Sequence, residues 1–374
     1  LVIKDAEGND KTIRINRIHM EEDAGKLVHG GESILSSSYS LPDYNRAAVP
    51  LIEIVTEPDI STAEEARAFA EQLRTALDYA GVSDVKMEQG SLRCDVNISL
   101  RPEGQAEFGT RTEVKNLNSM RSIERVIKYE QTRQAEVLDD GGRIIQETLN
   151  WDDAAGVALP MRSKENAHDY RYFPEPDLPP VIVSREWAMQ LASELPEMPT
   201  ARKERLMNEL GLSEYDATQI VANPALAFFF DDVNKILDDA KMVANWLLGD
   251  ICRILNLRGE EKIIIDCTDF AELLKKVKGG EINNTSAKTV LEEMFATGKP
   301  CAGIIKEKGF AQISDTSALE KAADEIIAAN PQPVADFKGG KEAALGFLVG
   351  QVMKATRGQA NAAMVKDLLR KKLS

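Results

Sequence analysis

The hydrophobic period changes from that of a helix to that of a strand within the first hundred residues, and this change most restricts the fold. Over residues 61–81 apolar residues recur at helical spacing, Ser61 and Glu64 predict a capping box, and Gly81 predicts the helix end. Over residues 91–100 apolar and polar residues alternate, which is typical of a strand with one wet face. We therefore expect an α+β region in which helices pack on antiparallel strands.

The alternation returns at residues 111–119 (RTEVKNLNS), so two polar strand faces could line one cleft. A hairpin is expected around Asp152 to Gly156. After the proline-rich stretch FPEPDLPP, helix formers dominate and prolines punctuate them. These breaks predict three domains, namely an α+β region over residues 1–183, an all-α helical domain over 184–298 and a small helical tail over 299–374.

The formal charge of −15 argues against broad, non-specific binding of nucleic acid, which needs clustered lysine and arginine. Residues 341–374 are the exception, because seven basic and two acidic residues give them a local charge of +5. A polyanion could dock there, and the alternative is an ordinary solvated helix end. Four scattered cysteines predict free, buried thiols and no zinc site: Cys94, Cys252, Cys267 and Cys301.

No apolar run reaches the roughly 18 to 20 residues that a membrane-spanning helix needs. The opening residues lack the order of a signal peptide, and Leu1 is not a methionine. We therefore expect a cytoplasmic chain with no membrane contact, beginning within a longer protein.

Two acidic segments are candidates for a magnesium site, since magnesium is usually held by one or two carboxylates together with substrate phosphates. The alternative for such clusters is solvated surface. Glu53 lies in the apolar run VPLIEIV, where an unpaired carboxylate would be costly, so a partner such as a metal is implied. The candidates are His19, Glu21, Glu22, Asp23 and Lys26 in HMEEDAGK, and Glu53, Glu57 and Asp59 in PLIEIVTEPD.

The sequence contains neither a P-loop nor a GxGxxG motif nor a GxSxG nucleophile elbow, so nucleotide binding must use another geometry. The remaining candidates are polar residues of the two alternating segments. Their spacing by itself indicates only that they form the polar faces of two strands. They are Glu88, Arg93 and Asp95 around the first segment, and Glu113, Lys115, Asn116 and Asn118 on the second.

Seven motifs, taken together and in this order, resemble the B subunit of the glutamyl/aspartyl-tRNA amidotransferases. The resemblance covers essentially the whole chain and implies a cradle-shaped α+β catalytic domain, a helical domain and a small helical tail similar to YqeY proteins. The motifs are HMEEDAGK, PLIEIVTEPDI, GVSDVKMEQGSLRCDVNIS, TEVKNLNS, DYRYFPEPD, NWLLGD and GFLVGQVMKATRGQAN.

The resemblance implies a ligase that acts in translation as part of a heterotrimer. With ATP and Mg²⁺ the B subunit phosphorylates the side-chain carboxylate of Glu-tRNA(Gln) or Asp-tRNA(Asn). Ammonia then displaces the phosphate to give Gln-tRNA(Gln) or Asn-tRNA(Asn). The implied partners are the amidase subunit of the amidotransferase, which makes ammonia from glutamine, its small third subunit and the tRNA.

The resemblance also assigns residues. Glu22 and Glu53 match magnesium-binding carboxylates of the family. Lys26, Arg93 and Lys115 are candidates for the phosphates or the acyl phosphate because of their charge and their place in the motifs, not because of a known family role. The remaining candidates have two roles: Glu88, Asp95, Glu113, Asn116 and Asn118 would line the nucleotide cleft, and Lys354, Arg357, Lys366, Arg370 and Lys371 would face tRNA.

One departure from the family leaves alternatives open. The resemblance implies that about the first hundred residues of a usual B subunit are absent here, including a strand that supplies a glutamate and a histidine to the metal. A chain in this form is expected to show weak or no kinase activity. The competing interpretation is therefore a catalytically inactive fragment that binds tRNA or aids assembly. The third interpretation is a free-standing metallohydrolase that uses carboxylates, and only the acidic segments support it.

Overall fold

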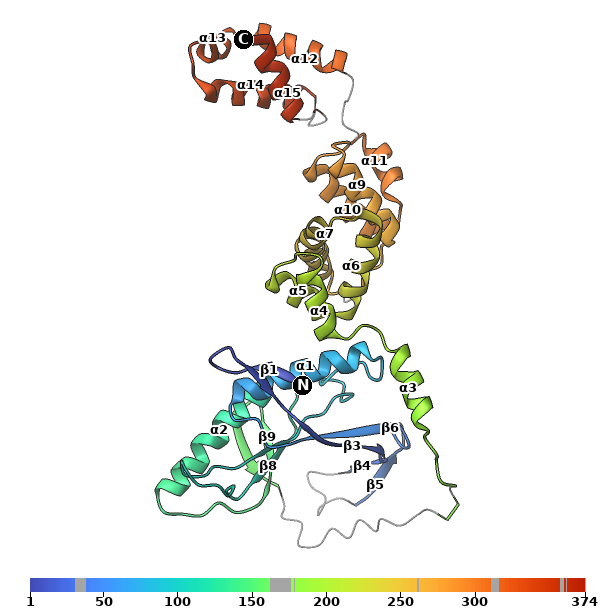
Figure 1. Cartoon of the computed structure of the whole chain (residues 1–374), viewed down its shortest axis with the longest axis vertical. Coiled ribbons are helices and arrows are strands. Elements are labelled where there is room, and N and C mark those ends of the chain that lie inside the picture. Colours follow the sequence, from blue (N-terminus) through green and yellow to red (C-terminus); the bar gives the residue numbers. More distant parts are fainter. Residues whose placement is uncertain are drawn as a thin grey trace. The chain divides into compact units, whose positions relative to one another are not determined.

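The computed structural model divides the chain into two compact units, residues 1–198 and 199–374, each of which is described here by itself (Figure 1). The predicted α+β class is confirmed, because all strands among the described residues lie in the first unit and the second is helical. The predicted domain limits at 183 and 298 stay predictions. The structure describes residues 1–30, 38–161, 176–177, 179–260, 262–310, 316–356, 360 and 362–373.

The strands of the first unit form one four-stranded sheet and three two-stranded ribbons. The ribbons are the antiparallel pairs β1–β2, β3–β6 and β4–β5, and Figure 1 shows β3 and β6 as the longest of them. The strands are β1 (Val2–Lys4), β2 (Asp10–Thr12), β3 (Ile15–Glu22), β4 (Lys26–His29), β5 (Ser40–Asp43), β6 (Pro50–Thr56), β7 (Val96–Ile98), β8 (Thr112–Lys115), β9 (Thr148–Asp152) and β10 (Val157–Pro160).

The four-stranded sheet has the order β10–β9–β8–β7. The predicted hairpin is confirmed as β9–β10, and Gly156 takes the positive φ of 71° that its turn requires. The pair β8–β9 is parallel, which departs from the expected antiparallel sheet. The reason is the connection, because helix α2 (Met120–Asp139) crosses over between the two strands.

Helix α1 (Ala63–Tyr79) begins one residue later than the predicted cap. The capping box is formed by Thr62 and Glu65, not by Ser61 and Glu64. Burial explains the shift, because Glu65 is enclosed and accepts a 2.7 Å hydrogen bond from Lys11 Nζ, while Glu64 is exposed. The predicted helix end is confirmed in position, since Gly81 with φ 67° follows the last turn.

The alternating segment at residues 91–100 has the predicted faces but pairs over a shorter length. Polar residues from Arg93 to Asn97 are exposed and Val96 is buried, while only Val96–Ile98 forms a strand. Asn116 explains the short pairing, because its φ of 68° turns the partner strand's chain away directly after β8. Helices α1 and α2 pack on each other, and the core beneath them includes Val114, Ile123, Val126, Leu149 and Trp151.

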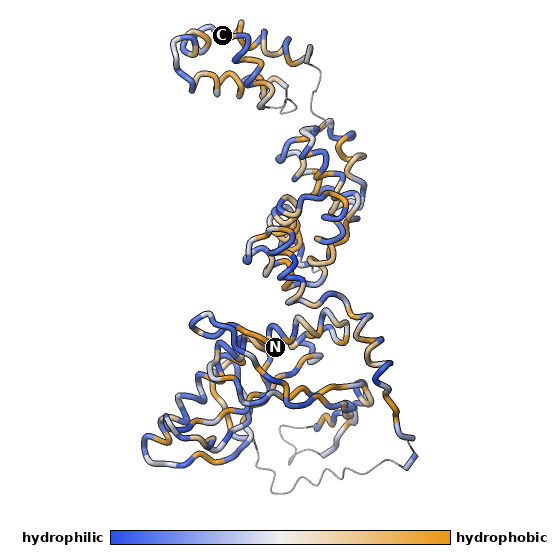
Figure 2. The backbone as a smooth tube through the Cα atoms, viewed as in Figure 1, coloured by the Kyte–Doolittle hydropathy of each residue, from blue (hydrophilic) through white to orange (hydrophobic). Residues whose placement is uncertain are grey.

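The second unit begins with helices α4 to α11, and the sequence-predicted α-helical character is confirmed. Hydrophobic and hydrophilic residues interchange along these helices, as expected where one face is buried (Figure 2). A π-helical turn at Leu247–Ile251 separates α7 from α8. The helices are α4 (Pro199–Asn208), α5 (Glu214–Val221), α6 (Pro224–Leu237), α7 (Ala240–Trp246), α8 (Cys252–Arg258), α9 (Cys267–Lys278), α10 (Asn284–Thr297) and α11 (Cys301–Lys308); α3 (Arg185–Glu194) belongs to the first unit.

The last four helices share a core of their own that includes Leu345, Leu348, Val352, Val365 and Leu369. None of the helices in the described ranges combines the length and apolar composition that crossing a membrane requires. These helices are α12 (Thr316–Ala329), α13 (Pro331–Lys338), α14 (Glu342–Ala355) and α15 (Ala362–Leu373).

The four cysteines are free, as predicted, but only Cys301 is fully buried and the other three are half-buried. The expectation of uniformly buried thiols was therefore wrong. Cys94, for example, packs against the core of the first unit without being fully enclosed, two residues before β7 begins.

Candidate functional site

One imidazole and two carboxylates meet on the β3–β6 ribbon. His19 Nε2 lies 2.6 Å from Glu53 Oε2 and 3.0 Å from Glu21 Oε1. Strand geometry explains the meeting, because residues two apart share a face and the register places His19 opposite Glu53. One potential ligand atom from each residue lies within 4.8 Å of the others. We call this set the His19 group; it is the one cluster of three or more such ligands in the part of the chain that the structure describes.

The predicted ligand pair is arranged differently from the expectation. Glu22 is exposed and lies opposite Pro50, and strand alternation puts it on the other face of β3 from Glu21. Its assignment to magnesium stays a prediction. Glu53 has a partner in the structure, as its apolar neighbours implied: His19 contacts it, although the Glu53 side chain is 50% exposed. A two-stranded ribbon leaves both faces open.

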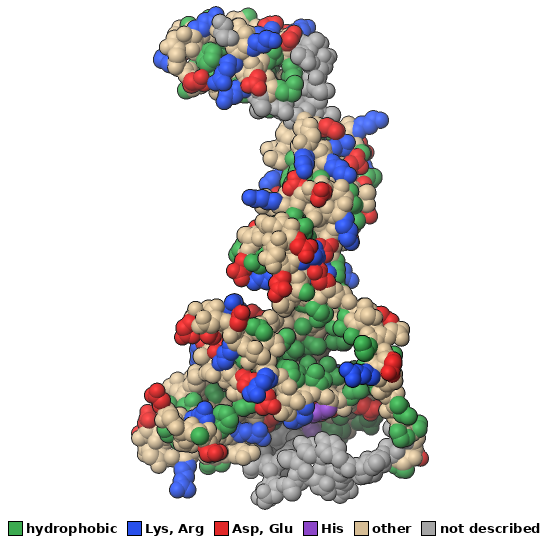
Figure 3. Space-filling view, viewed as in Figure 1, with side chains coloured by type: hydrophobic (Ala, Val, Ile, Leu, Met, Phe, Trp, Pro, Cys, Tyr) green, Lys and Arg blue, Asp and Glu red, His purple; other side chains and the backbone are tan. Residues whose placement is uncertain are grey.

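The opposite face of the ribbon is apolar and exposed. Ile18 is 59%, Met20 84% and Ile52 42% accessible. Hydrophobic side chains gather at the surface of the first unit, where histidine is also visible (Figure 3). The apolar residues next to Glu53 in the sequence therefore form the second, exposed face of the β3–β6 ribbon and are not part of a buried core.

The two alternating segments form a strip of charges across β7 and β8, as their polar faces suggested. Lys115 Nζ lies 2.9 Å from Asp95 Oδ2 and 3.2 Å from Glu113 Oε1. Burial by itself would lower the pKa of Lys115, but the hydrogen bond and charge of Asp95, together with Glu113, raise it above its ordinary value. Lys115 is therefore a fixed cation at neutral pH.

Arg93 connects this strip to the ribbon that carries the His19 group. Its Nη2 lies 3.0 Å from Asp23 Oδ2, and Asp23 follows the end of β3. Arg46 approaches the same oxygen at 2.9 Å. The structure thus brings three of the sequence-predicted residues, His19, Glu21 and Glu53, into the His19 group. It brings five others into ion pairs: Asp23, Arg93, Asp95, Glu113 and Lys115. Arg46 was missed, since nothing in its local sequence marks it.

The other predicted cleft residues are exposed. Glu88 lies in the loop before β7, and Lys26 begins β4 opposite Asp43. Asn116 and Asn118 stand between β8 and the start of α2. Their roles stay predictions.

A buried carboxylate supports the strip from beneath, and sequence analysis did not find it. Glu130 of α2 has no exposed surface and accepts hydrogen bonds from Thr112 on β8 and from Gln134. Gln134 Oε1 in turn accepts from the Leu100 backbone N–H at 3.1 Å. The sequence did contain one sign of this contact: Glu130 and Gln134 are four residues apart, which places both on the apolar face of α2.

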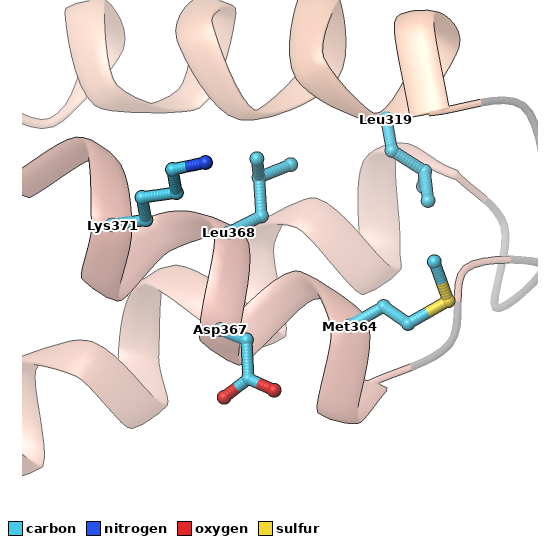
Figure 4. Close-up of a pocket in the computed structure, with 5 residues that line it drawn as sticks. All are labelled: Leu319, Met364, Asp367, Leu368 and Lys371. Atoms are coloured by element: carbon cyan, nitrogen blue, oxygen red, sulfur yellow. The ribbon is translucent and has the colours of Figure 1, made fainter.

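The basic tail is partly engaged in ion pairs. Arg370 Nη2 lies 3.2 Å from Glu342 Oε1, while Lys354 and Lys366 are exposed. Arg357 lies outside the described residues, as does most of the DYRYFPEPD motif. The tail also contains a hollow of about 270 Å³ between α12 and α15. Its surface is mostly apolar, and it is lined by Leu319, Met364, Asp367, Leu368 and Lys371 (Figure 4).

Comparison with known proteins assigns the chain to a family. Residues 1–189 match the GatB/GatE catalytic domain, and residues 228–373 match the GatB domain. Relatives named as the B subunit of aspartyl/glutamyl-tRNA(Asn/Gln) amidotransferase share 53% identity in Carboxydothermus hydrogenoformans and 52% in both Moorella thermoacetica and Caldicellulosiruptor saccharolyticus. These matches span 98 to 99% of this chain and 77% of each relative. The chain therefore belongs to the family of tRNA-dependent amidotransferase B subunits.

Proposed function

We propose that this chain is the amide-forming subunit of a glutamine-hydrolysing tRNA amidotransferase, a ligase of translation. The His19 group and the charged strip beside it would bind ATP with Mg²⁺ and the aminoacyl end of Glu-tRNA(Gln) or Asp-tRNA(Asn). The observation that carries the proposal is the convergence of His19, Glu21 and Glu53, joined to the cations of the strip through Arg93 and Asp23.

The donor set fits a divalent cation that is also coordinated by phosphates. Two carboxylates and an imidazole lie close enough to share one ion, and their partial exposure leaves room for water and substrate oxygens. Magnesium bound at this group supplies neutralisation of charge on the transferred phosphoryl group. His19, Glu21 and Glu53 would hold it.

The chain's own cations would position the reactants. Arg93 and Lys115 are held by carboxylates and present positive charge where phosphate oxygens would lie. In the proposed first step a side-chain carboxylate oxygen bonds to the terminal phosphorus of ATP and ADP leaves. In the second, ammonia bonds to the acyl carbon and phosphate leaves, so the carboxylate becomes an amide.

The proposal includes partners and location. The relatives are named as B subunits, and we propose that this chain also assembles with an amidase subunit and with a small third subunit. The exposed Lys354 and Lys366 of the tail would contact tRNA phosphates. The cytoplasmic location stays a prediction.

The test is ATP turnover and amide formation by this chain with the amidase and small subunits and misacylated tRNA. We expect turnover that depends on tRNA, and we expect Glu53→Gln to abolish it while tRNA affinity is retained. Binding of tRNA without any ATP turnover would favour the inactive binding or assembly fragment instead. Magnesium-dependent hydrolysis of ATP without tRNA would favour the free-standing hydrolase.

A further inference from the structure

Asp23 holds two arginines on a single oxygen atom. Arg46 Nη2 lies 2.9 Å and Arg93 Nη2 3.0 Å from Asp23 Oδ2. The Asp23 side chain is only 16% exposed, whereas the two arginine side chains are about half exposed, at 48% and 55%. The carboxylate is thus enclosed, and each guanidinium keeps part of its donor surface toward solvent.

The backbone fixes Asp23 at the end of the β3–β6 ribbon. Its N–H donates to Val49 O at 2.9 Å, and the Ala48 N–H donates to Asp23 O at 3.0 Å. Ala48 has a φ of 61°, a left-handed conformation that a non-glycine residue keeps only where its surroundings impose it. Asp23 follows the end of β3 and is two residues from Glu21, or roughly 7 Å along an extended chain, so its backbone is close to that of the strand that carries His19 and Glu21.

Arg46 braces a third segment. Its Nη2 also donates to Gly90 O at 3.2 Å, and a side chain at Gly90 would meet Arg46 Nη1 at 3.1 Å. Arg46 therefore connects the ribbon to the loop that leads into Arg93. The position of Arg93 is determined both by its own ion pair and by the loop before it.

The charges of this cluster do not cancel. Two guanidinium groups are always ionised and share one carboxylate, so a net positive charge remains. Each guanidinium has five N–H donors, and a single shared oxygen uses few of them. The arrangement orients cations for a further anion and does not neutralise them.

We propose that Asp23 is a positioning residue that, with Arg46 as a brace, holds Arg93 beside the His19 group so that its free N–H donors bind the phosphates of ATP. This inference rests on the proposed function. A purely structural ion pair would stabilise the fold and leave the affinity for nucleotide unchanged.

The test compares Asp23→Asn, Asp23→Glu and Arg46→Ala in the complex with the amidase and small subunits. We expect Asp23→Asn and Arg46→Ala each to raise the KM for ATP by about tenfold or more, because a misplaced arginine loses a charge-assisted hydrogen bond. The combined variant is expected to be no worse than the more impaired single variant, because both act on Arg93. Asp23→Glu is expected to recover part of the affinity. Asp10→Asn, which removes the exposed partner of Lys4, is the matched control and should leave KM unchanged.

A second measurement needs no catalysis. The affinity of this chain alone for Mg·ADP can be measured by calorimetry. We expect the affinity to fall in Asp23→Asn and Arg46→Ala and to be unchanged in Asp10→Asn. If Asp23→Asn fails to fold, Asp23→Glu and Arg46→Lys take its place, since they keep the charges; the first changes the reach of the carboxylate, and the second also removes the forked guanidinium donors.

The outcomes separate the two proposals. An unsubstituted complex that turns over no ATP overturns the proposed function, and this inference with it. Normal turnover with an unchanged KM in Asp23→Asn, or fully additive effects of the Asp23 and Arg46 substitutions, overturns the positioning role alone.

Discussion

Thr112 Oγ1 donates a 2.8 Å hydrogen bond to Glu130 Oε2, and this bond joins β8 to α2 inside the core of the first unit. Arg133 completes the coordination of the same carboxylate, at 2.7 Å from Nε to Oε1. A buried charge is tolerated only when it is paired and hydrogen-bonded, and here every partner comes from α2 or from the strand beneath it. The charged strip on the outer face of β8 therefore rests on an ionic contact below the sheet.

Replacing Glu130 by alanine should destabilise the first unit by about 3 kcal/mol, because Thr112, Arg133 and Gln134 lose a shared partner. The measurement is hydrogen exchange of the α2 amides in urea. Glu136→Ala, at an exposed position of the same helix, is the control and should change stability by less than about 0.5 kcal/mol. Equal effects of the two substitutions would contradict the prediction.

The contribution of Glu130 should depend on pH. Burial by itself would raise the pKa of Glu130, but hydrogen bonds from Arg133, Gln134 and Thr112 outweigh it and lower the pKa below its ordinary value of 4.5. The stabilisation is therefore fully present above pH 4.5 and is lost as the pH falls through the lowered value. The difference in unfolding free energy between the unsubstituted chain and Glu130→Gln should shrink with acidification over that range.

Substitutions on the two faces of β3 decide which glutamate holds a metal. We expect Glu21→Gln to weaken Mn²⁺ binding roughly 10- to 100-fold, since it removes a ligand of the His19 group. Glu22→Gln, one residue away on the other face, should bind Mn²⁺ normally. Paramagnetic resonance of bound Mn²⁺ measures both, and the reverse result would support the assignment of Glu22 that the family resemblance implies.

The Asp59 carboxylate offers a direct check of the first unit's electrostatics. The side-chain hydrogen bonds from Arg14, then its backbone N–H and its charge, lower the pKa of Asp59 to about 2. Stability from this pair is present above pH 3.8, the ordinary value, and is lost as the pH falls toward 2. NMR titration should find this value in the unsubstituted chain and a higher value in Arg14→Ala, which removes the side-chain hydrogen bonds and the charge but keeps the backbone N–H donor; an unchanged titration in Arg14→Ala would refute the assignment.

The tail should bind tRNA through its exposed lysines more than through Arg370. Lys366→Ala is expected to weaken tRNA binding uniformly and to reduce the salt slope of the affinity by about one. Arg370→Ala should have a smaller effect, because that guanidinium already pairs with Glu342. Fluorescence titration over a range of salt concentrations measures both slopes, and identical slopes for all three chains would exclude the tail from the tRNA contact.

Local sequence patterns predicted the features that depend only on which nearby residues are buried, namely helix ends and strand faces. Helical spacing located α1 to within two residues at each end, and alternation assigned the faces of residues 92–97 correctly. The cap of α1 was wrong by one residue because Lys11, some fifty residues away in the chain, selects Glu65 over Glu64. No local pattern contains that information.

The candidate site was predictable only in part, for the same reason. The pairing of His19 with Glu53 depends on the register of two strands that are separated by a long connection. The cluster at Asp23 collects arginines from two further segments. Residue type and motif membership identified Glu53, Arg93 and Lys115 as candidates, but their partners follow only from tertiary structure.

The parallel pairing of β8 with β9 limits how a chain of this kind can change in length. Helix α2 carries the chain from one strand to the next while its buried face holds Glu130 and Gln134. One residue inserted into the helix would rotate everything after it by about 100° and detach that face from the sheet. Insertions and deletions are therefore expected outside this helical crossover, which should keep its length.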